Sequence, residues 1–274
     1  MKYVFLPWVQ NHIDKTKIYS WDEISTNCNA MDFLIENPAK MTWSNLIKNS
    51  DPRAIQYLLS LKTDIILYDQ YGSPSINRDE NSIRWQTLSK ILHFSLLESH
   101  LEFLCWDNLS ENPNAIPLLE KNPKKINWQI LSSNPSAISL LEANQGKIDW
   151  SALSLNPGAI SLLEANQDKI NWSYLSNNPN AISLIEKNLH KIDWSILSNN
   201  INAIHLLRMN PYKIDWKYLS ANINAIELLE ENQDKIVWHN LSYNINAIKL
   251  LEKNQDKIVW SNLLSNPSIF HRVE

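Results

Sequence analysis

Apolar residues recur along most of the chain in one order, which combines helical spacing with a period of 22 residues. In the stretch WSALSLNPGAISLLEANQDKIN (150–171), with tryptophan as position 1, apolar residues occupy positions 1, 4, 10, 11, 13, 14 and 21. Most other positions are polar. A fixed period in this range is typical of a stacked array of repeats. The tryptophans that set the period are Trp106, Trp128, Trp150, Trp172, Trp194, Trp216, Trp238 and Trp260, and Trp21 and Trp43 share the spacing.

Each repeat predicts two short helices. Asparagine at position 7 followed by proline at position 8 is a strong helix start, and Ala159, Ile160, Leu162 and Leu163 then form a helical stripe. Asp149, just before a tryptophan, is expected to cap a second helix of six or seven residues. Neither helix is long enough to be stable alone, so the repeats must bury one another. We therefore expect the central tryptophans to form a buried column: Trp150, Trp172 and Trp194.

The pattern predicts an all-α fold, an α-solenoid of about eleven or twelve two-helix repeats that fills 1–274 as a single array. Residues 1–67 hold an N-terminal cap and divergent repeats, and 68–84 form an insert loop without the pattern. Repeats restart over 85–259, regular from 106, and 260–274 form a C-terminal cap. The alternative is a leucine-rich-repeat-like solenoid, because L-x-x-N recurs. However, position 2 is polar where that repeat needs an apolar residue, and proline after asparagine suits a helix start better.

The run N-P-x-A-I-x-L-L-E-x-N followed by K-I-x-W-x-x-L-S resembles the short repeats in proteins encoded by giant DNA viruses of amoebae and algae. The resemblance covers 106–266 closely and 21–105 loosely. It implies a viral protein that acts in the cytoplasm or viral factory of an infected cell, or in the virion. It implies an origin rather than an activity.

Composition and charge narrow the classes of partner. The net charge of −4 provides no global field that would attract nucleic acid or acidic lipid. No apolar run approaches the length of a membrane span, and the first nine residues hold one lysine, a proline and too short an apolar stretch for a signal peptide. The two cysteines, Cys28 and Cys105, suggest a reducing compartment, so we expect a cytoplasmic protein without a membrane partner.

Candidate chemistry is sparse. The seven histidines form no ligand set with cysteine, and the chain has no glycine-rich phosphate loop. Glutamate at position 15, which recurs in six of the regular units, and lysine at position 20 repeat one environment, which predicts solvated ladders with ion pairs between repeats rather than a catalytic pair. We predict no catalytic, cofactor-binding or metal-binding residues and no cofactor. An enzyme would have to place its chemistry in the insert 68–84.

The residues that change between repeats are the candidates for function. Positions 3 and 6 lie on one side of the short helix and mix tyrosine, isoleucine, leucine and asparagine, a composition that suits a partner surface. Alternatively, position 3 is half-buried between repeats. The candidate partner-binding residues are Ile130, Leu155, Tyr174, Ile196, Tyr218 and Tyr243.

The sequence thus predicts a non-enzymatic repeat scaffold that mediates protein–protein interaction. The alternative is a helical repeat protein that reads RNA or single-stranded nucleic acid, one base per repeat. The acidic balance and the glutamate ladder disfavour nucleic acid, because its phosphates need a basic surface.

Overall fold

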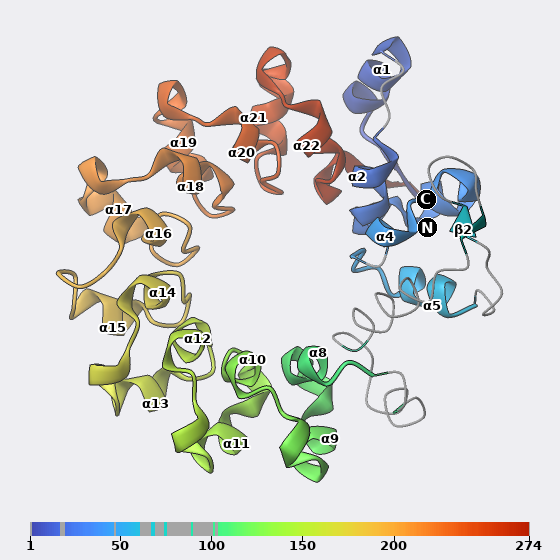
Figure 1. Ribbon diagram of the computed structural model, residues 1–274. Coiled ribbons are helices and arrows are strands. Elements are labelled where there is room, and N and C mark those ends of the chain that lie inside the picture. Colours follow the sequence, from blue (N-terminus) through green and yellow to red (C-terminus); the bar gives the residue numbers. More distant parts are fainter. Residues whose placement is uncertain are drawn as a thin grey trace. The chain divides into compact units, whose positions relative to one another are not determined.

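The computed structural model describes residues 2–16, 20–46, 48–60, 67–68, 74–75, 89, 101 and 104–273 (Figure 1). The chain divides into two compact units, each described by itself. Unit 1 comprises Met1–Pro74 and Asp215–Glu274, and unit 2 comprises Ser75–Ile214. Most of the predicted insert 68–84, and most of the weakened repeat predicted to begin at Trp85, lie outside the described residues.

The described part is mainly helical, with short helices in a regular repeating order. A typical repeat of unit 2 consists of α12 (Trp150–Leu155), a turn, α13 (Ile160–Glu164) and the 3₁₀ helix η7 (Gln167–Lys169). The predicted all-α repeat character is therefore confirmed. No strand occurs between Trp106 and Ile269, where a leucine-rich repeat needs one strand per unit.

The remaining elements follow the same order. Those of unit 2 are α8 (Trp106–Glu111), η3 (Pro113–Ala115), α9 (Ile116–Lys121), η4 (Pro123–Lys125), α10 (Trp128–Ser132), η5 (Pro135–Ala137), α11 (Ile138–Glu142), η6 (Gln145–Lys147), α14 (Trp172–Ser176), α15 (Ile182–Glu186), α16 (Trp194–Leu197), α17 (Ile204–Met209) and η8 (Pro211–Lys213). Those of unit 1 are β1 (Lys2–Phe5), α1 (Pro7–Thr16), α2 (Trp21–Thr26), η1 (Cys28–Ala30), α3 (Met31–Glu36), η2 (Pro38–Lys40), α4 (Trp43–Leu46), α5 (Pro52–Ser60), β2 (Leu67–Tyr68), α18 (Trp216–Ala221), α19 (Ile226–Glu230), η9 (Gln233–Lys235), α20 (Trp238–Leu241), α21 (Ile248–Lys253), η10 (Gln255–Lys257), α22 (Trp260–Leu264), η11 (Pro267–Ile269) and β4 (Phe270–Val273). The short strand β3 (Pro74–Ser75) lies at the boundary of the two units.

From Trp128 to Trp216, the short helix that begins at each tryptophan starts as the sequence predicts. Asp149 has an extended backbone, and its Oδ1 accepts a hydrogen bond from the backbone N of Ala152 at 2.8 Å. Asn171 caps α14 and Asp193 caps α16 in the same way. These caps pair amide groups that a helix leaves free in its first turn.

The interior of each repeat is built from leucine and alanine. In the repeat of α12, Leu153, Ala159 and Leu163 are completely buried. Each buried leucine contributes about 2 kcal/mol. One repeat has too few apolar side chains to bury these residues by itself, so their burial depends on the neighbouring repeats.

A ladder of buried asparagines at position 7 joins consecutive repeats. Asn156 donates from Nδ2 to the carbonyl oxygens of Ser132 at 3.0 Å and Asn134 at 2.9 Å, both in the preceding repeat. Its Oδ1 accepts from the backbone N of Gly158 at 2.9 Å, which closes the turn into the next helix. One side chain thus satisfies two buried carbonyl groups, which otherwise carry a large desolvation cost, and one amide of the turn.

A second ladder uses serine at position 5. The Ser154 hydroxyl donates to the Trp150 carbonyl at 2.7 Å and accepts from the backbone N of Asn171, at the start of the following repeat, at 3.0 Å. The hydroxyl therefore ties each short helix to the segment that enters the next one.

The tryptophans differ from the expectation of a buried column. Trp150, Trp172 and Trp194 are half-buried. A lysine ammonium covers one face of each: Lys169 Nζ lies 4.5 Å from the ring centre of Trp150, and Lys191 Nζ lies 4.7 Å from that of Trp172. The same contact recurs at 4.3–4.8 Å for Trp106, Trp128, Trp194, Trp216 and Trp238. The rings lie at the edge of the core, where cation–π attraction and the lysine methylenes cover them.

The predicted ion pairs between the glutamate and lysine ladders are accordingly wrong. Within 104–273 no ion pair joins the two ladders. One glutamate of the ladder, Glu186, instead contacts His205 at 2.9 Å. An exposed ion pair is worth little in water, whereas a lysine over tryptophan also covers apolar surface.

Unit 1 contains an element that the all-α prediction did not include. β1 and β4 pair in an antiparallel two-stranded sheet, with Tyr3 opposite Arg272 and Phe5 opposite Phe270. The predicted N-terminal and C-terminal cap regions therefore contact each other. An alternating pattern of four residues is too short to have indicated these strands.

Candidate functional site

A shallow groove runs across the short helices α8, α10, α12 and α14 of unit 2. Its volume is about 580 Å³, and its walls come from positions 2, 3, 6 and 22 of four consecutive repeats. These positions line the groove because positions 4 and 5 of each short helix are buried, as Leu153 and Ser154 show. The positions that are not buried between the short helices thus line one continuous groove.

Side-chain hydrogen bonds between one short helix and the cap of the next order this surface. Asn127 donates from Nδ2 to Asp107 Oδ1 at 2.9 Å, and Asn171 donates from Nδ2 to Ser151 Oγ at 3.2 Å. In each bond, position 2 of one short helix accepts from position 22 of the same 22-residue unit, which is the residue that caps the next short helix. The capping residues are therefore fixed on both sides, by their own helix and by the adjacent repeat.

Three of the predicted partner-binding residues lie in this groove. Ile130 is half-buried, Leu155 is 37% exposed and Tyr174 is 44% exposed. They provide an apolar strip across three repeats. The expectation that position 3 is half-buried between repeats describes Ile130 but not Tyr174.

The other three predicted residues lie outside the groove. Ile196 is half-buried on α16 of unit 2 and does not line the groove. Tyr218 and Tyr243 belong to unit 1, where they are 41% and 46% exposed. The Tyr243 ring meets the His239 ring edge-on, with 6.1 Å between their centres. The structure thus brings together only half of the predicted set.

The charged residues that line the groove are acidic. Glu111 comes from α8, and Asp149 is the capping residue of α12. No lysine or arginine is among the lining residues. A hollow lined by carboxylates and by no lysine or arginine favours a cationic ligand group, because a concave wall focuses their field.

The polar part of the groove, which is formed by Gln129, Ser151 and the position 22 residues, was not among the residues predicted to bind a partner. A signal for position 22 was present: a capping residue must lie beside the first turn of the short helix, and positions 2 and 3 belong to that turn. The spacing alone gave no such signal for position 2.

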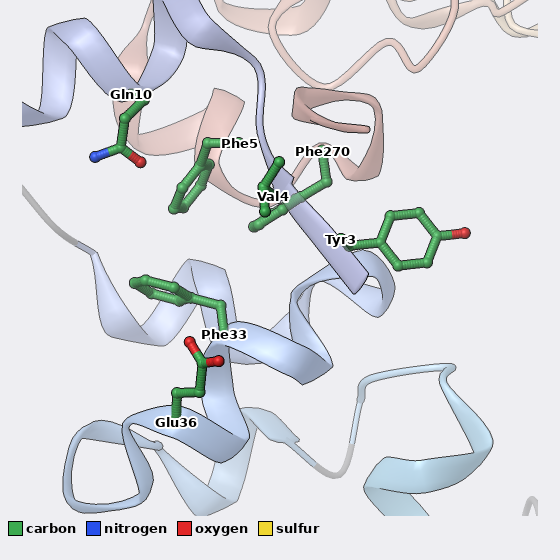
Figure 2. A pocket seen from close by; sticks show the side chains of 7 residues that line it. All are labelled: Tyr3, Val4, Phe5, Gln10, Phe33, Glu36 and Phe270. Carbon is green, nitrogen blue, oxygen red and sulfur yellow. The ribbon is translucent and has the colours of Figure 1, made fainter. Parts of the chain in front are cut away.

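A second, smaller pocket of about 120 Å³ lies in unit 1 between β1, β4 and α3 (Figure 2). The Phe5 ring stacks on Phe270 at 4.3 Å and meets Phe33 edge-on at 5.2 Å. Gln10 and Glu36 reach its rim, and the Tyr3 ring points away from the cluster (Figure 2). Phe5 and Phe270 are almost fully buried, so this cluster mainly packs the strand pair against α3.

Two searches of the described residues concern other classes of site. No group of three or more histidine, cysteine, aspartate or glutamate residues in that part of the chain could hold a metal ion. Across the same residues, no helix combines the length and the apolar character that a membrane crossing requires.

Comparisons with known proteins give no relative for this chain. No family model matches it, and the searches of curated proteins and of solved structures each find no match.

Proposed function

We propose that the chain is a non-enzymatic repeat scaffold, an α-solenoid whose groove binds an extended segment of a protein partner. One observation carries the proposal. The serine and asparagine that join the repeats are the same in every repeat from Trp106 to Ile214, whereas the residues that line the groove change, as Asn108, Ile130, Ala152 and Tyr174 do at position 3. Constant joints with a varying surface are the design of repeat proteins that bind along their stack.

The dimensions of the groove suit an extended peptide. Packed helices lie about 8–10 Å apart, and an extended chain rises about 3.3 Å per residue, so each repeat corresponds to about three residues of ligand. Four repeats then hold a segment of about ten residues. Its apolar side chains would lie against Ile130, Leu155 and Tyr174.

The charge of the groove favours a basic segment. A lysine or arginine of the partner would lie near Glu111 and Asp149. The same carboxylates would repel phosphates, so we propose a protein partner rather than RNA. From the resemblance of the repeat alone, we further propose a viral origin and a place of action in the infected cell or the virion.

Peptide selection tests the proposal. Purified chain would select binders from a displayed library of random 12-residue peptides, and fluorescence anisotropy would then give the Kd of each synthesised binder. We expect basic peptides with apolar residues, and Ile130→Ala with Tyr174→Ala should weaken them at least about tenfold. Tyr212→Ala, at an 81% exposed tyrosine outside the groove, is the control. Equal Kd values for the groove variant and the control would contradict the proposal.

A second variant isolates the charge. Asp149→Asn removes a carboxylate but keeps a capping oxygen, because asparagine caps the same position in Asn127 and Asn171. We expect the helix content to stay constant while basic peptides bind several-fold more weakly and with less dependence on salt. If affinity and salt dependence were unchanged, the acidic groove would have no role in recognition.

A further inference from the structure

Within unit 1, the last repeat packs against the first through the contacts that join consecutive repeats. Asn27 donates from Nδ2 to the carbonyl oxygens of Leu264 at 3.1 Å and Asn266 at 3.0 Å. Asn266 itself donates in the same way to Ser242 at 3.2 Å and Asn244 at 3.0 Å. The asparagine ladder thus passes from the last repeat to the first, although 237 residues separate Asn27 from Leu264.

A second contact of the array is also reproduced. Asn29 donates from Nδ2 to the Pro267 carbonyl at 2.9 Å. Asn180 makes the equivalent bond to Pro157 within unit 2, also at 2.9 Å. We call the interface that 2–16 and 20–30 form with 260–273 the terminal junction. It is a repeat interface formed between two segments that lie far apart in the sequence.

The terminal junction lacks one hydrogen bond that the other repeats share. Position 5 is serine in the regular repeats, and its hydroxyl binds the backbone of the segment that enters the next repeat, as Ser242 does with Val259 N at 3.2 Å. In the last repeat that position is Leu264, which is buried and cannot form this bond. Leucine replaces serine in the last repeat of the chain, and this repeat packs against the first repeat instead of against one that follows it in the sequence.

Contacts of other kinds hold the junction instead. β1 pairs with β4, and Phe5 stacks on Phe270 (Figure 2). The His12 ring of α1 lies parallel to Trp260, with 3.4 Å between the ring centres and 6° between the planes. All of these contacts are non-covalent, so the junction can separate without breaking the array on either side.

We propose that the terminal junction opens and that a second copy of the chain can take its place, so that the first repeat of one copy packs on the last repeat of another. Opening exposes the amide of Asn27 and the carbonyls of Leu264, Asn266 and Pro267, whose pairing has to be restored. Another copy offers the same complementary face, as in domain swapping. The closed chain prevails at low concentration, because its two faces are held at a high effective concentration.

Native mass spectrometry of mixed isotopes tests the proposal on the full chain. Normal and ¹⁵N-labelled protein are incubated together at several hundred micromolar, and we expect dimers of intermediate mass. The decisive variant carries Tyr3→Cys and Arg272→Cys, at paired positions of β1 and β4, with Cys28 and Cys105 replaced by serine. Oxidised, this chain is locked closed and should form no mixed dimer; reduced, it should form one as the unmodified chain does.

A matched pair of point variants tests whether the two copies meet at the terminal junction. Asn29→Ala removes one bond across the junction and should accelerate mixed-dimer formation about fivefold, the effect expected from one lost hydrogen bond. Asn180→Ala removes the equivalent internal bond and should leave the rate within twofold. Mixed dimers formed equally well by the oxidised chain would place the contact on another surface and overturn the proposal. Failure to form any mixed dimer would also overturn it.

Discussion

At the scale of single residues, the asparagine at position 7 holds the repeats together more than any charged group does. Asn156 is completely buried and pairs with backbone groups on both sides of its repeat interface. An amide is suited to this position because it donates and accepts from the same planar group. Serine, aspartate and leucine each lack part of that capacity.

Replacing this asparagine should therefore lower the free energy of unfolding, by an amount that depends on whether the new side chain can donate hydrogen bonds. Asn156→Ala leaves the Ser132 and Asn134 carbonyls without these donors, and we expect a loss of roughly 3 kcal/mol in the free energy of unfolding. Asn156→Asp keeps the shape but faces those carbonyls with a carboxylate, so at pH 7 it should be the more destabilising variant. Urea unfolding followed by circular dichroism measures both, and an aspartate variant as stable as the native chain would contradict this role.

The residues that cap the short helices could be predicted from the sequence, whereas the contacts of the side chains on the helix faces could not. The Asp149 cap follows from local chemistry, since its partner lies three residues away. The position of Lys169 over Trp150 does not follow from spacing, because a long flexible side chain can reach either a carboxylate or a ring. How far the tryptophan ring is buried depends on whether the lysine contacts the ring or a carboxylate.

At the scale of elements, the sequence predicted two helices per repeat, and the structure adds a turn or 3₁₀ helix before the second one and, in most repeats, a 3₁₀ helix after it. Asn112 was expected to cap an α-helix at Pro113, but it caps η3, and α9 begins only at Ile116. The Asn112 side chain accepts from the backbone N two residues later, which produces a tighter turn than an α-helix start. The pairing of β1 with β4 could not be predicted, because strand partners hundreds of residues apart leave no local signal.

The contact of α1 with α22 should depend on pH. Burial, and then the charge of Lys15 on the same helix, lower the pKa of His12 on its Trp260 partner. The segment Trp260–Leu264 of α22 carries no titratable side chain. A histidine with a lowered pKa contributes stability that is present above its unfolded value of about 6.5 and is lost as the pH falls below it. We therefore expect the amides of α1 and β1 to lose protection from hydrogen exchange below about pH 6.5.

The variant His12→Phe supplies the control for this dependence. It keeps a flat ring on Trp260 but cannot take up a proton, so its protection should stay constant over the same pH range once intrinsic exchange rates are corrected. If the native chain and the variant lost protection alike, another group would be responsible for the acid response.

At the scale of the whole molecule, the chain divides between Ile214 and Asp215, where no change in composition marks a boundary. The repeats on both sides share the same pattern, because the joints on the two sides of this division use the same serine and asparagine. The sequence therefore predicts the period of an array more readily than its division into units. Each unit has its own interior, so damage to one should spread first through its own repeats.

This division predicts where a core substitution acts and how strongly. Leu175 of unit 2 is completely buried, whereas the neighbouring Trp172 is half-buried beneath Lys191. Leu175→Ala should cost about 3 kcal/mol, and Trp172→Ala should cost less despite the larger side chain, because part of its space is already open to water. Hydrogen exchange followed by mass spectrometry should show faster exchange across α12–α16, with α20–α22 of unit 1 unchanged. If Trp172→Ala lowered the free energy of unfolding more than Leu175→Ala does, tryptophan would contribute to the core as a buried side chain. Equal acceleration of hydrogen exchange in both units would show that the two units unfold together.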